Sequence, residues 1–456
     1  MLGEKRIREL ADRILAGSPA DETEVVLLAG ESALTRYANS AIHQNVAQQD
    51  AEVRIRACIG QRIGVTTTND LSATALASAC ARAAEVARLS PPLPHFPGLP
   101  QPTRLRPLAA FSEATAGCSP ERRAEGIATI CRLAAAKGLT AAGAFSTETI
   151  EIAVANSHGL FAYFPTTRAE LTVVMMADDG SGYASALALD VEAIDPEALA
   201  EEAAGRALLG RAPHDLAPGV YPVVLETYAV DDFLHMFTQT AFGAVAFQEG
   251  RSFMAGRLGQ PVMDPRISIW DDGWDTAGLP LPFDFEGVPK GRVDLIERGR
   301  ARGVVWDRYT AAREPRAAGA HALPYSTGHA LPAPNLSGPL PLNLFFGAGD
   351  ASREELIAGL DKGLLVTRFH YTRPVHPAQV VVTGMTRDGT FWVEKGEIAY
   401  PVKNLRFTQS YLQALNQVEA IGRETRLHRG FVSDFGVDRV PALRLSGFHF
   451  TGATEF

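Results

Sequence analysis

Residues 231–250 of the chain read Asp-Asp-Phe-Leu-His-Met-Phe-Thr-Gln-Thr-Ala-Phe-Gly-Ala-Val-Ala-Phe-Gln-Glu-Gly. Apolar side chains recur every three or four positions and Gly250 ends the pattern, which predicts one helix over residues 231–249. A hydrolytic zinc helix carries two imidazoles about one turn apart and a glutamate that activates water. This helix offers the single imidazole of His235, and Met236 follows it. The residues by themselves favour a half-buried structural histidine over a metal ligand.

The chain before this helix contains a segment typical of a linker. Residues 213–222 combine prolines with glycine and polar residues. We therefore predict an N-terminal domain over residues 1–212 and a C-terminal domain over residues 213–456. Apart from the helix 231–249 and a capped helix over residues 352–363, the C-terminal half is predicted to be strand and loop.

The N-terminal half combines helices with short β-rich runs. Apolar periodicity and N-cap residues predict helices over residues 4–17, 119–138 and 195–209. A further Ala-rich helix is predicted to run to about Leu89, with Asn69, Asp70 and Ser72 as candidate caps. Runs such as Glu24–Leu28 and Ala33–Tyr37 are separated by breaks and predict an antiparallel meander. Residues 91–107 contain seven prolines, which favour an extended connector. The predicted fold class is α+β, with an N-terminal α/β domain on a mainly antiparallel sheet and a β-rich C-terminal domain.

The composition excludes several kinds of protein. The chain has 456 residues, of which 46% are hydrophobic and 21% charged, as in globular proteins and unlike disordered ones. Its formal net charge of −9 argues against direct contact with nucleic acid. The four cysteines all precede residue 132 and are too sparse for a disulfide framework. We find no apolar run typical of a signal peptide or membrane span, so a cytoplasmic location without membrane contact is expected.

Several short motifs follow one another along the chain in a fixed order. They are Arg36-Tyr-Ala-Asn-Ser, Ile42-His-Gln, Gly64-Val-Thr-Thr-Thr-Asn-Asp70-Leu, Glu249-Gly-Arg-Ser252-Phe-Met-Ala-Gly256-Arg, Ile269-Trp-Asp271-Asp272-Gly273, Gly363-Leu-Leu-Val-Thr367-Arg368-Phe and Gly396-Glu-Ile-Ala-Tyr-Pro401-Val-Lys-Asn404-Leu. In this order they resemble the TldD/PmbA family, the "modulator of DNA gyrase" metalloproteases. The resemblance implies a barrel-like C-terminal domain and an assembly of two subunits.

The resemblance also locates the family's zinc motif. In the catalytic TldD-type subunit the helix carries His-Glu-x-x-x-His, and a cysteine near the C-terminus completes the zinc site. Counting back from Gly250 places the first motif position at His235, the glutamate at Met236 and the second histidine at Thr240. No cysteine follows residue 131, and the expected cysteine position falls near Ser433 or Asp434.

These replacements imply the non-catalytic TldE/PmbA type. The chain is then expected to hold no cofactor of its own and to pair with a zinc-containing TldD-type subunit, or with itself, in the proteolysis of unfolded or flexible peptides. Two alternatives stay open. One is an active homodimeric metallopeptidase whose metal site is rebuilt from His235, His370, His376 or Asp434. The other is a non-proteolytic scaffold or regulator, so whether the chain is itself an enzyme is not decided by its sequence.

Two apolar segments of the second half are candidates for peptide contact. Strand edges offer unpaired amides and carbonyls to an extended chain of any sequence. We name Phe345, Phe346, Thr367 and Arg368 as candidate peptide-binding residues, although core strands explain these segments equally well. Asp271-Asp272-Gly273 follows an apolar run and predicts a strand that ends in a turn.

Overall fold

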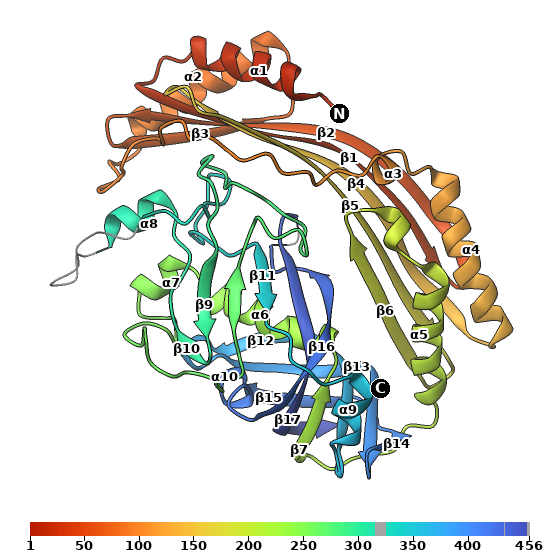
Figure 1. Ribbon diagram of the computed structural model, residues 1–456. Coiled ribbons are helices and arrows are strands. Elements are labelled where there is room, and N and C mark those ends of the chain that lie inside the picture. The colour runs from red at the N-terminus through yellow and green to blue at the C-terminus, as the bar shows by residue number, and fades with distance from the viewer. Residues whose placement is uncertain (315–324, 433, 454–456) are drawn as a thin grey trace.

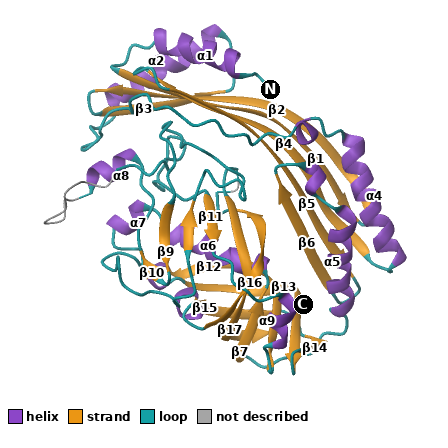
Figure 2. Ribbon diagram, in the orientation of Figure 1, coloured by secondary structure: helices purple, strands orange, loops and turns teal. Residues whose placement is uncertain are grey.

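The computed structural model describes residues 1–314, 325–432 and 434–453. A long arched sheet, with helices on its convex side, lies over a second, strand-rich body that occupies its concave side (Figures 1 and 2). The first body is formed by the N-terminal half of the chain and the second by the C-terminal half. The α+β fold class is therefore confirmed.

The arched sheet is antiparallel, with six strands in the order β3-β2-β1-β4-β5-β6. Its strands are β1 (Glu22–Ala38), β2 (Ala41–Ile59), β3 (Arg62–Thr68), β4 (Thr140–Asn156), β5 (Phe161–Met176) and β6 (Ser181–Ala188). The predicted break within β1 was wrong, because the strand continues through Gly30. A side chain there would meet the backbone oxygen of Thr149 on β4 at 2.1 Å, so glycine permits the close pairing.

Helices cover the convex face of this sheet in two groups (Figure 1). They are α1 (Glu4–Ala16), α2 (Ala73–Leu89), α3 (Glu113–Ala116), α4 (Pro120–Ala136), the 3₁₀ turn η1 (Val191–Ala193) and α5 (Pro196–Leu209). The side chains of Ser72, Ser119 and Asp195 accept hydrogen bonds from the first turns of α2, α4 and α5. These caps satisfy backbone donors that a helix leaves free at its start, so the predicted helix starts agree closely with the observed ones.

The C-terminal body is a mixed sheet that closes on itself. Its strands are β7 (Gly219–Leu225), β8 (Ile269–Asp271), β9 (Val293–Glu297), β10 (Arg300–Ala301), β11 (Asn343–Phe346), β12 (Lys362–His376), β13 (Val381–Glu394), β14 (Glu397–Pro401), β15 (Leu405–Ser410), β16 (Val418–Arg429) and β17 (Val437–Ala453). The ring closes because β7 pairs with both β12 and β17. Its short helices are α6 (Thr227–Thr240), α7 (Ala244–Gln248), α8 (Arg308–Arg313), α9 (Arg353–Ala358), η2 (Pro377–Gln379) and α10 (Tyr411–Ala414).

Two predicted helices of this half have the wrong extent. The segment 231–249 is not one helix, since α6 ends at Thr240 and α7 begins at Ala244. Gly243 lies in the break, where an added Cβ would come within 2.5 Å of the backbone oxygen of Pro339. Packing against this distant segment therefore interrupts a sequence with continuous helical periodicity. The helix predicted over residues 352–363 ends at Ala358, and the chain enters β12 soon afterwards.

The two bodies meet through an apolar cluster and a buried ion network. Val26, Ile152 and Phe164 on the concave face of the sheet share one core with Phe283 and Phe285.

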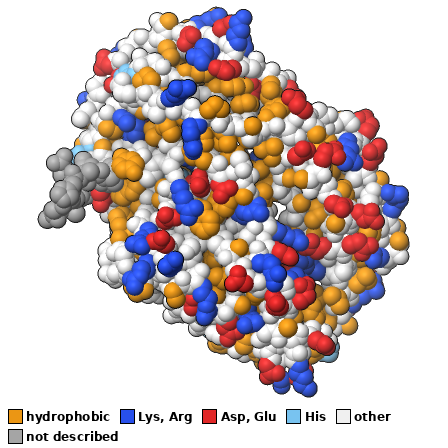
Figure 3. Space-filling view, viewed as in Figure 1, with side chains coloured by type: hydrophobic (Ala, Val, Ile, Leu, Met, Phe, Trp, Pro, Cys, Tyr) orange, Lys and Arg blue, Asp and Glu red, His pale blue; other side chains and the backbone are white. Residues whose placement is uncertain are grey.

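The domain boundary between residues 212 and 213 stays a prediction. None of the helices within the described ranges has the length and apolar character needed to cross a membrane. The face of the molecule in Figure 3 carries acidic and basic side chains in close mixture.

Candidate functional site

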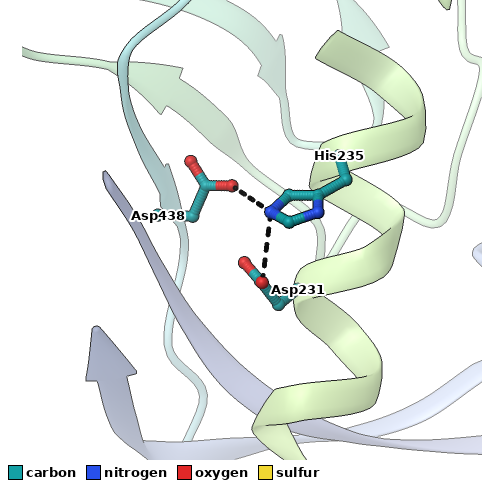
Figure 4. Close-up of side chains that lie close together, drawn as sticks. All are labelled: Asp231, His235 and Asp438. Atoms are coloured by element: carbon teal, nitrogen blue, oxygen red, sulfur yellow. Dashed lines mark ion pairs between the residues drawn. The ribbon is translucent and has the colours of Figure 1, made fainter. Parts of the chain in front are cut away.

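His235 lies on α6 and faces two carboxylates from different parts of the chain (Figure 4). Its Nε2 atom is 3.3 Å from Oδ2 of Asp231, one turn earlier on the helix, and 3.6 Å from Oδ2 of Asp438 on β17. The same nitrogen is 2.9 Å from the backbone oxygen of Arg429, at the end of β16. The site therefore joins one helix to two strands of the C-terminal body.

The two carboxylates are buried while the imidazole is partly exposed. Asp231 is 8% exposed and Asp438 is 2% exposed. Burial, and then the neighbouring Asp232 carboxyl, hold the pKa of Asp231 well above its usual range. Burial and Asp231 likewise raise the pKa of Asp438, against the opposing effect of His235. The pocket is thus a low-dielectric site in which negative charge is disfavoured unless a cation compensates it.

The positions expected for the catalytic glutamate and the second zinc histidine are part of the hydrophobic core. Met236 is buried in the main core of the C-terminal body. Thr240 is 3% exposed, and its Oγ1 donates to the backbone oxygen of Met236 at 2.6 Å. A thioether cannot exchange a proton, and the threonine hydroxyl is engaged with the helix backbone. The residues present at the motif positions therefore do not fit the family's zinc ligand set or its water-activating base.

The other candidate metal ligands lie outside this site. Among the described residues, the group of three or more side chains whose ligand atoms lie within 4.8 Å of one another is Asp231, His235 and Asp438. His370 is half-buried on β12 and His376 is exposed at the end of that strand. Asp434 is exposed in the loop before β17, where its backbone oxygen accepts from Arg168 at 3.2 Å. The Ser433 position lies outside the described residues.

The candidate peptide-binding side chains are mostly buried. Phe345 and Phe346 on β11 are 4% and 2% exposed, and the Phe345 ring stacks on that of Trp270 at 5.6 Å. Thr367 is fully buried, while Arg368 pairs with Asp388 and lies over the ring of Tyr183. These side chains contribute to the core and to the contact between the two bodies, and direct peptide contact by them stays a prediction.

A trough of about 410 Å³ lies between the concave face of the arched sheet and the loop that leads to Asp438. Its walls are formed mainly by β1, β2 and β4 on one side and by Pro332, Asp434 and Phe435 on the other. Arg429 connects the sheet to the histidine site, because its side chain pairs with Glu148 and Glu170 while its backbone oxygen contacts His235. The histidine site and the trough are therefore neighbouring parts of one inter-body region.

Sequence reasoning identified His235 but missed both of its carboxylate neighbours. Asp231 had a usable signal, because residues four apart on a helix lie on the same face. Asp438 had no such signal in the sequence, because it is brought to α6 only by the pairing of β17 with β16 and β11.

Three domain descriptions of one family match the chain in order. They are the "PmbA/TldA metallopeptidase domain 1" over residues 23–87, the "central domain" over residues 120–211 and the "C-terminal domain" over residues 218–452. The chain belongs to the PmbA/TldA metallopeptidase family. The resemblance stated from the sequence motifs is thus confirmed.

Several relatives of this PmbA/TldA chain are named as metalloproteases. The chain is 26% identical to the "Metalloprotease PmbA" of Escherichia coli O157:H7, over 95% of this chain and 94% of that protein. It is also 26% identical to a "Metalloprotease" of Methanothermobacter thermautotrophicus, where the match covers 48% of this chain and 46% of the relative. The matches to the first relatives thus span about half of the relatives' length.

Solved structures share the fold of this PmbA/TldA chain. TldE from Thermococcus kodakarensis superposes with a TM-score of 0.86 at 20% identity, covering 98% of this chain and all of that one (100%). A Thermotoga maritima protein named for modulation of a DNA gyrase gives a TM-score of 0.85 at 21% identity, with 98% and 100% covered. At this level of identity the likeness shows the fold alone.

Proposed function

We propose that this chain is a cytoplasmic TldE/PmbA-type subunit that pairs with a TldD-type subunit, or with a second copy of itself, in the proteolysis of unfolded or flexible peptides. By itself it is expected to hydrolyse no peptide. The observation that carries the proposal is the burial of Met236 and Thr240 in the core at the positions of the family's glutamate and second histidine. The zinc of the working assembly would then belong to the partner.

The first half of β2 supports the assembly. Residues 41–52 pair with β1 on one side, and the pairing of β2 with β3 begins only at Val53. Residues 41–50 are exposed, and this stretch contains no proline or lysine, the residues that commonly protect a free edge. An edge that pairs with no other strand in the described part of the chain is suited to pairing with a strand of another subunit.

The trough supports the handling of peptides. It lies against a sheet whose concave wall presents apolar, amide and charged side chains, including Leu28, Gln48 and Asp50. A mixed lining of this kind suits extended chains of varied sequence better than one defined small ligand.

The proposal is tested by measuring cleavage of an unstructured fluorogenic peptide by the purified chain, alone and with a TldD-type protein encoded in the same genome. We expect no cleavage by the chain alone and zinc-dependent cleavage by the pair. Cleavage by the chain alone that His235→Ala abolishes would contradict the proposal and favour a rebuilt active site. A stable pair that cleaves no peptide would favour the scaffold alternative.

The assembly surface is tested separately by the molar mass in solution. Val46 is 42% exposed on β2, and Val86 on α2 has a matched exposure of 43%. Val46→Lys is expected to reduce the measured mass towards that of one chain. A lysine at this position would be buried when another strand pairs with the edge, and this opposes pairing. Val86→Lys should leave the mass unchanged. Equal behaviour of the two variants would exclude the β2 edge as the pairing surface.

A further inference from the structure

The pocket around His235 has an unbalanced charge. Among the described residues, the ion pairs made by Asp231 and Asp438 are those with His235, and neither carboxylate pairs with a lysine or arginine. An imidazole carries at most one positive charge and is often neutral near pH 7. Two buried carboxylates with so little compensation are costly in a folded protein.

The same carboxylates also have oxygen atoms without hydrogen-bond partners. Oδ1 of Asp231 and Oδ2 of Asp438 are buried and accept no hydrogen bond from a backbone amide or a basic side chain among the described residues. The two carboxyl groups face each other closely enough to share a proton, which a bound ion would replace. Oδ2 of Asp438 is the atom that faces Nε2 of His235. Buried polar atoms in native proteins nearly always have a partner, so these two oxygens point to a ligand.

The distances within the pocket fit a single metal ion. Ligand atoms bound at about 2.1 Å to one ion lie about 3.0–3.4 Å apart when they are neighbours in octahedral or tetrahedral geometry. Nε2 of His235 is 3.3 Å from Asp231 and 3.6 Å from Asp438. It also lies 2.9 Å from the backbone oxygen of Arg429, in a hydrogen bond that the ion would replace, with the imidazole proton then on Nδ1. The ligand atoms of the three side chains all lie within 4.8 Å of one another.

We propose that Asp231, His235 and Asp438, with the backbone oxygen of Arg429, bind one divalent transition-metal ion. A ligand set of two carboxylates, a carbonyl and one imidazole favours manganese or zinc. Magnesium prefers sites made of oxygen alone, and copper(I) prefers sulfur. On binding, the ion displaces the proton held between the two carboxyl groups and ties α6 to β16 and β17. This ligand set shares only His235 with the family's His-His-Cys zinc site, and it departs from the expectation that the chain holds no metal. It does not depend on the function proposed above.

The proposal is tested on the full chain after removal of metal with a chelator. Titration with Mn²⁺ or Zn²⁺ is followed by calorimetry, and bound Mn²⁺ by electron paramagnetic resonance. We expect one ion per chain and, at 100 times the Kd, a thermal midpoint raised by about 2–4 °C. Nitrogen modulation from one imidazole should appear in the Mn²⁺ signal and disappear in His235→Ala.

Two variants separate binding from folding. Asp438→Asn should weaken metal binding by at least about 100-fold. It should still fold, because an amide has the size of a carboxyl group and is neutral, and its metal-free thermal midpoint should equal or exceed that of the wild type. Asp434→Asn, in the preceding loop, should bind as the wild type does. Wild-type protein that binds neither ion at millimolar concentration, or binding that Asp438→Asn and His235→Ala leave unchanged, would overturn the proposal.

Discussion

Asp271 shows how a single side chain can organise several loops. Its Oδ1 atom is 2.8 Å from Nε2 of His329, and Oδ2 accepts from the backbone nitrogens of Leu342 and Asn343 at 2.8 and 2.7 Å. Lys290 lies 3.9 Å away and is fully buried with it. Burial raises the pKa of Asp271, but Lys290 and His329 more than reverse this and hold it below its usual range. The adjacent Asp272 makes the turn contact that the sequence predicted, whereas Asp271 is part of the core.

Asp271→Asn is expected to lower the free energy of unfolding by about 3–5 kcal/mol, because Lys290 would remain buried without its anion. Asp272→Asn is the matched control. Its side-chain oxygen can still accept from the backbone nitrogen of Trp274, so a loss below about 1 kcal/mol is expected. Urea unfolding at pH 7 measures both. If both variants lost the same free energy of unfolding, the buried contacts of Asp271 with Lys290 and His329 would not be stabilising.

At the scale of elements, glycines set how closely helices approach the arched sheet. Gly182 on β6 lies under α5, and an added Cβ there would meet the backbone oxygen of Ala203 at 2.0 Å. Gly205 lies on the exposed side of the same helix and has no atom within 4 Å of an added Cβ. The first glycine is required by packing, while the second only lowers the helix propensity of α5.

The two glycines therefore predict opposite effects of the same substitution. Gly182→Ala should destabilise the chain by about 1–3 kcal/mol, because α5 must move away from the sheet. Gly205→Ala should stabilise it by up to about 1 kcal/mol, through the lower backbone entropy of the unfolded chain. Thermal unfolding of both variants checks the pair. If Gly182→Ala left the thermal midpoint unchanged, α5 would be free to move on the sheet.

At the scale of the whole molecule, a buried ion network connects the two bodies. Arg56 on β2 pairs with Glu24 on β1 at 2.6 Å and with Glu286 of the C-terminal body at 3.1 Å. Burial raises the pKa of Glu24 to about 7, although Arg56 acts in the opposite direction. Glu24 is thus linked to the docking of one body on the other, and its protonation changes with pH in the neutral range.

The pH dependence of stability follows from this shift. Unfolded Glu24 loses its proton near pH 4.5, while the folded chain keeps it up to about pH 7. Unfolding therefore releases a proton between these values, and the contribution of Glu24 to stability is present below pH 4.5 and is lost as the pH rises towards 7. The change is about 3 kcal/mol at most, since one pKa unit corresponds to about 1.4 kcal/mol.

Glu24→Gln should remove this contribution. The stability of the variant relative to the wild type is expected to increase between pH 4.5 and pH 7.5, as measured by urea unfolding across that range. Glu9→Gln, on the exposed face of α1, serves as the control and should follow the wild-type curve. A constant difference between Glu24→Gln and wild type across the range would contradict the assignment.

Helix starts and the identity of one site residue could be predicted from the sequence because their causes are local. Ser72, Ser119 and Asp195 act on backbone atoms two or three residues away. His235 follows from the order of the family motifs. Strand lengths were underestimated because Gly30 disfavours a strand locally, whereas pairing with β4 on one side and β2 on the other extends β1 through it.

The amino-acid sequence alone determined the α+β class, the capped helices and the family, and it predicts that Met236 and Thr240 replace two residues of the family's zinc motif. Only the tertiary structure decided that the segment 231–249 breaks at Gly243, and that Asp438 joins Asp231 at His235. Caps and periodicity act within a few residues, so they can be read along the chain. A helix break caused by a distant backbone, or a carboxylate placed by strand pairing, depends on contacts between residues far apart in sequence.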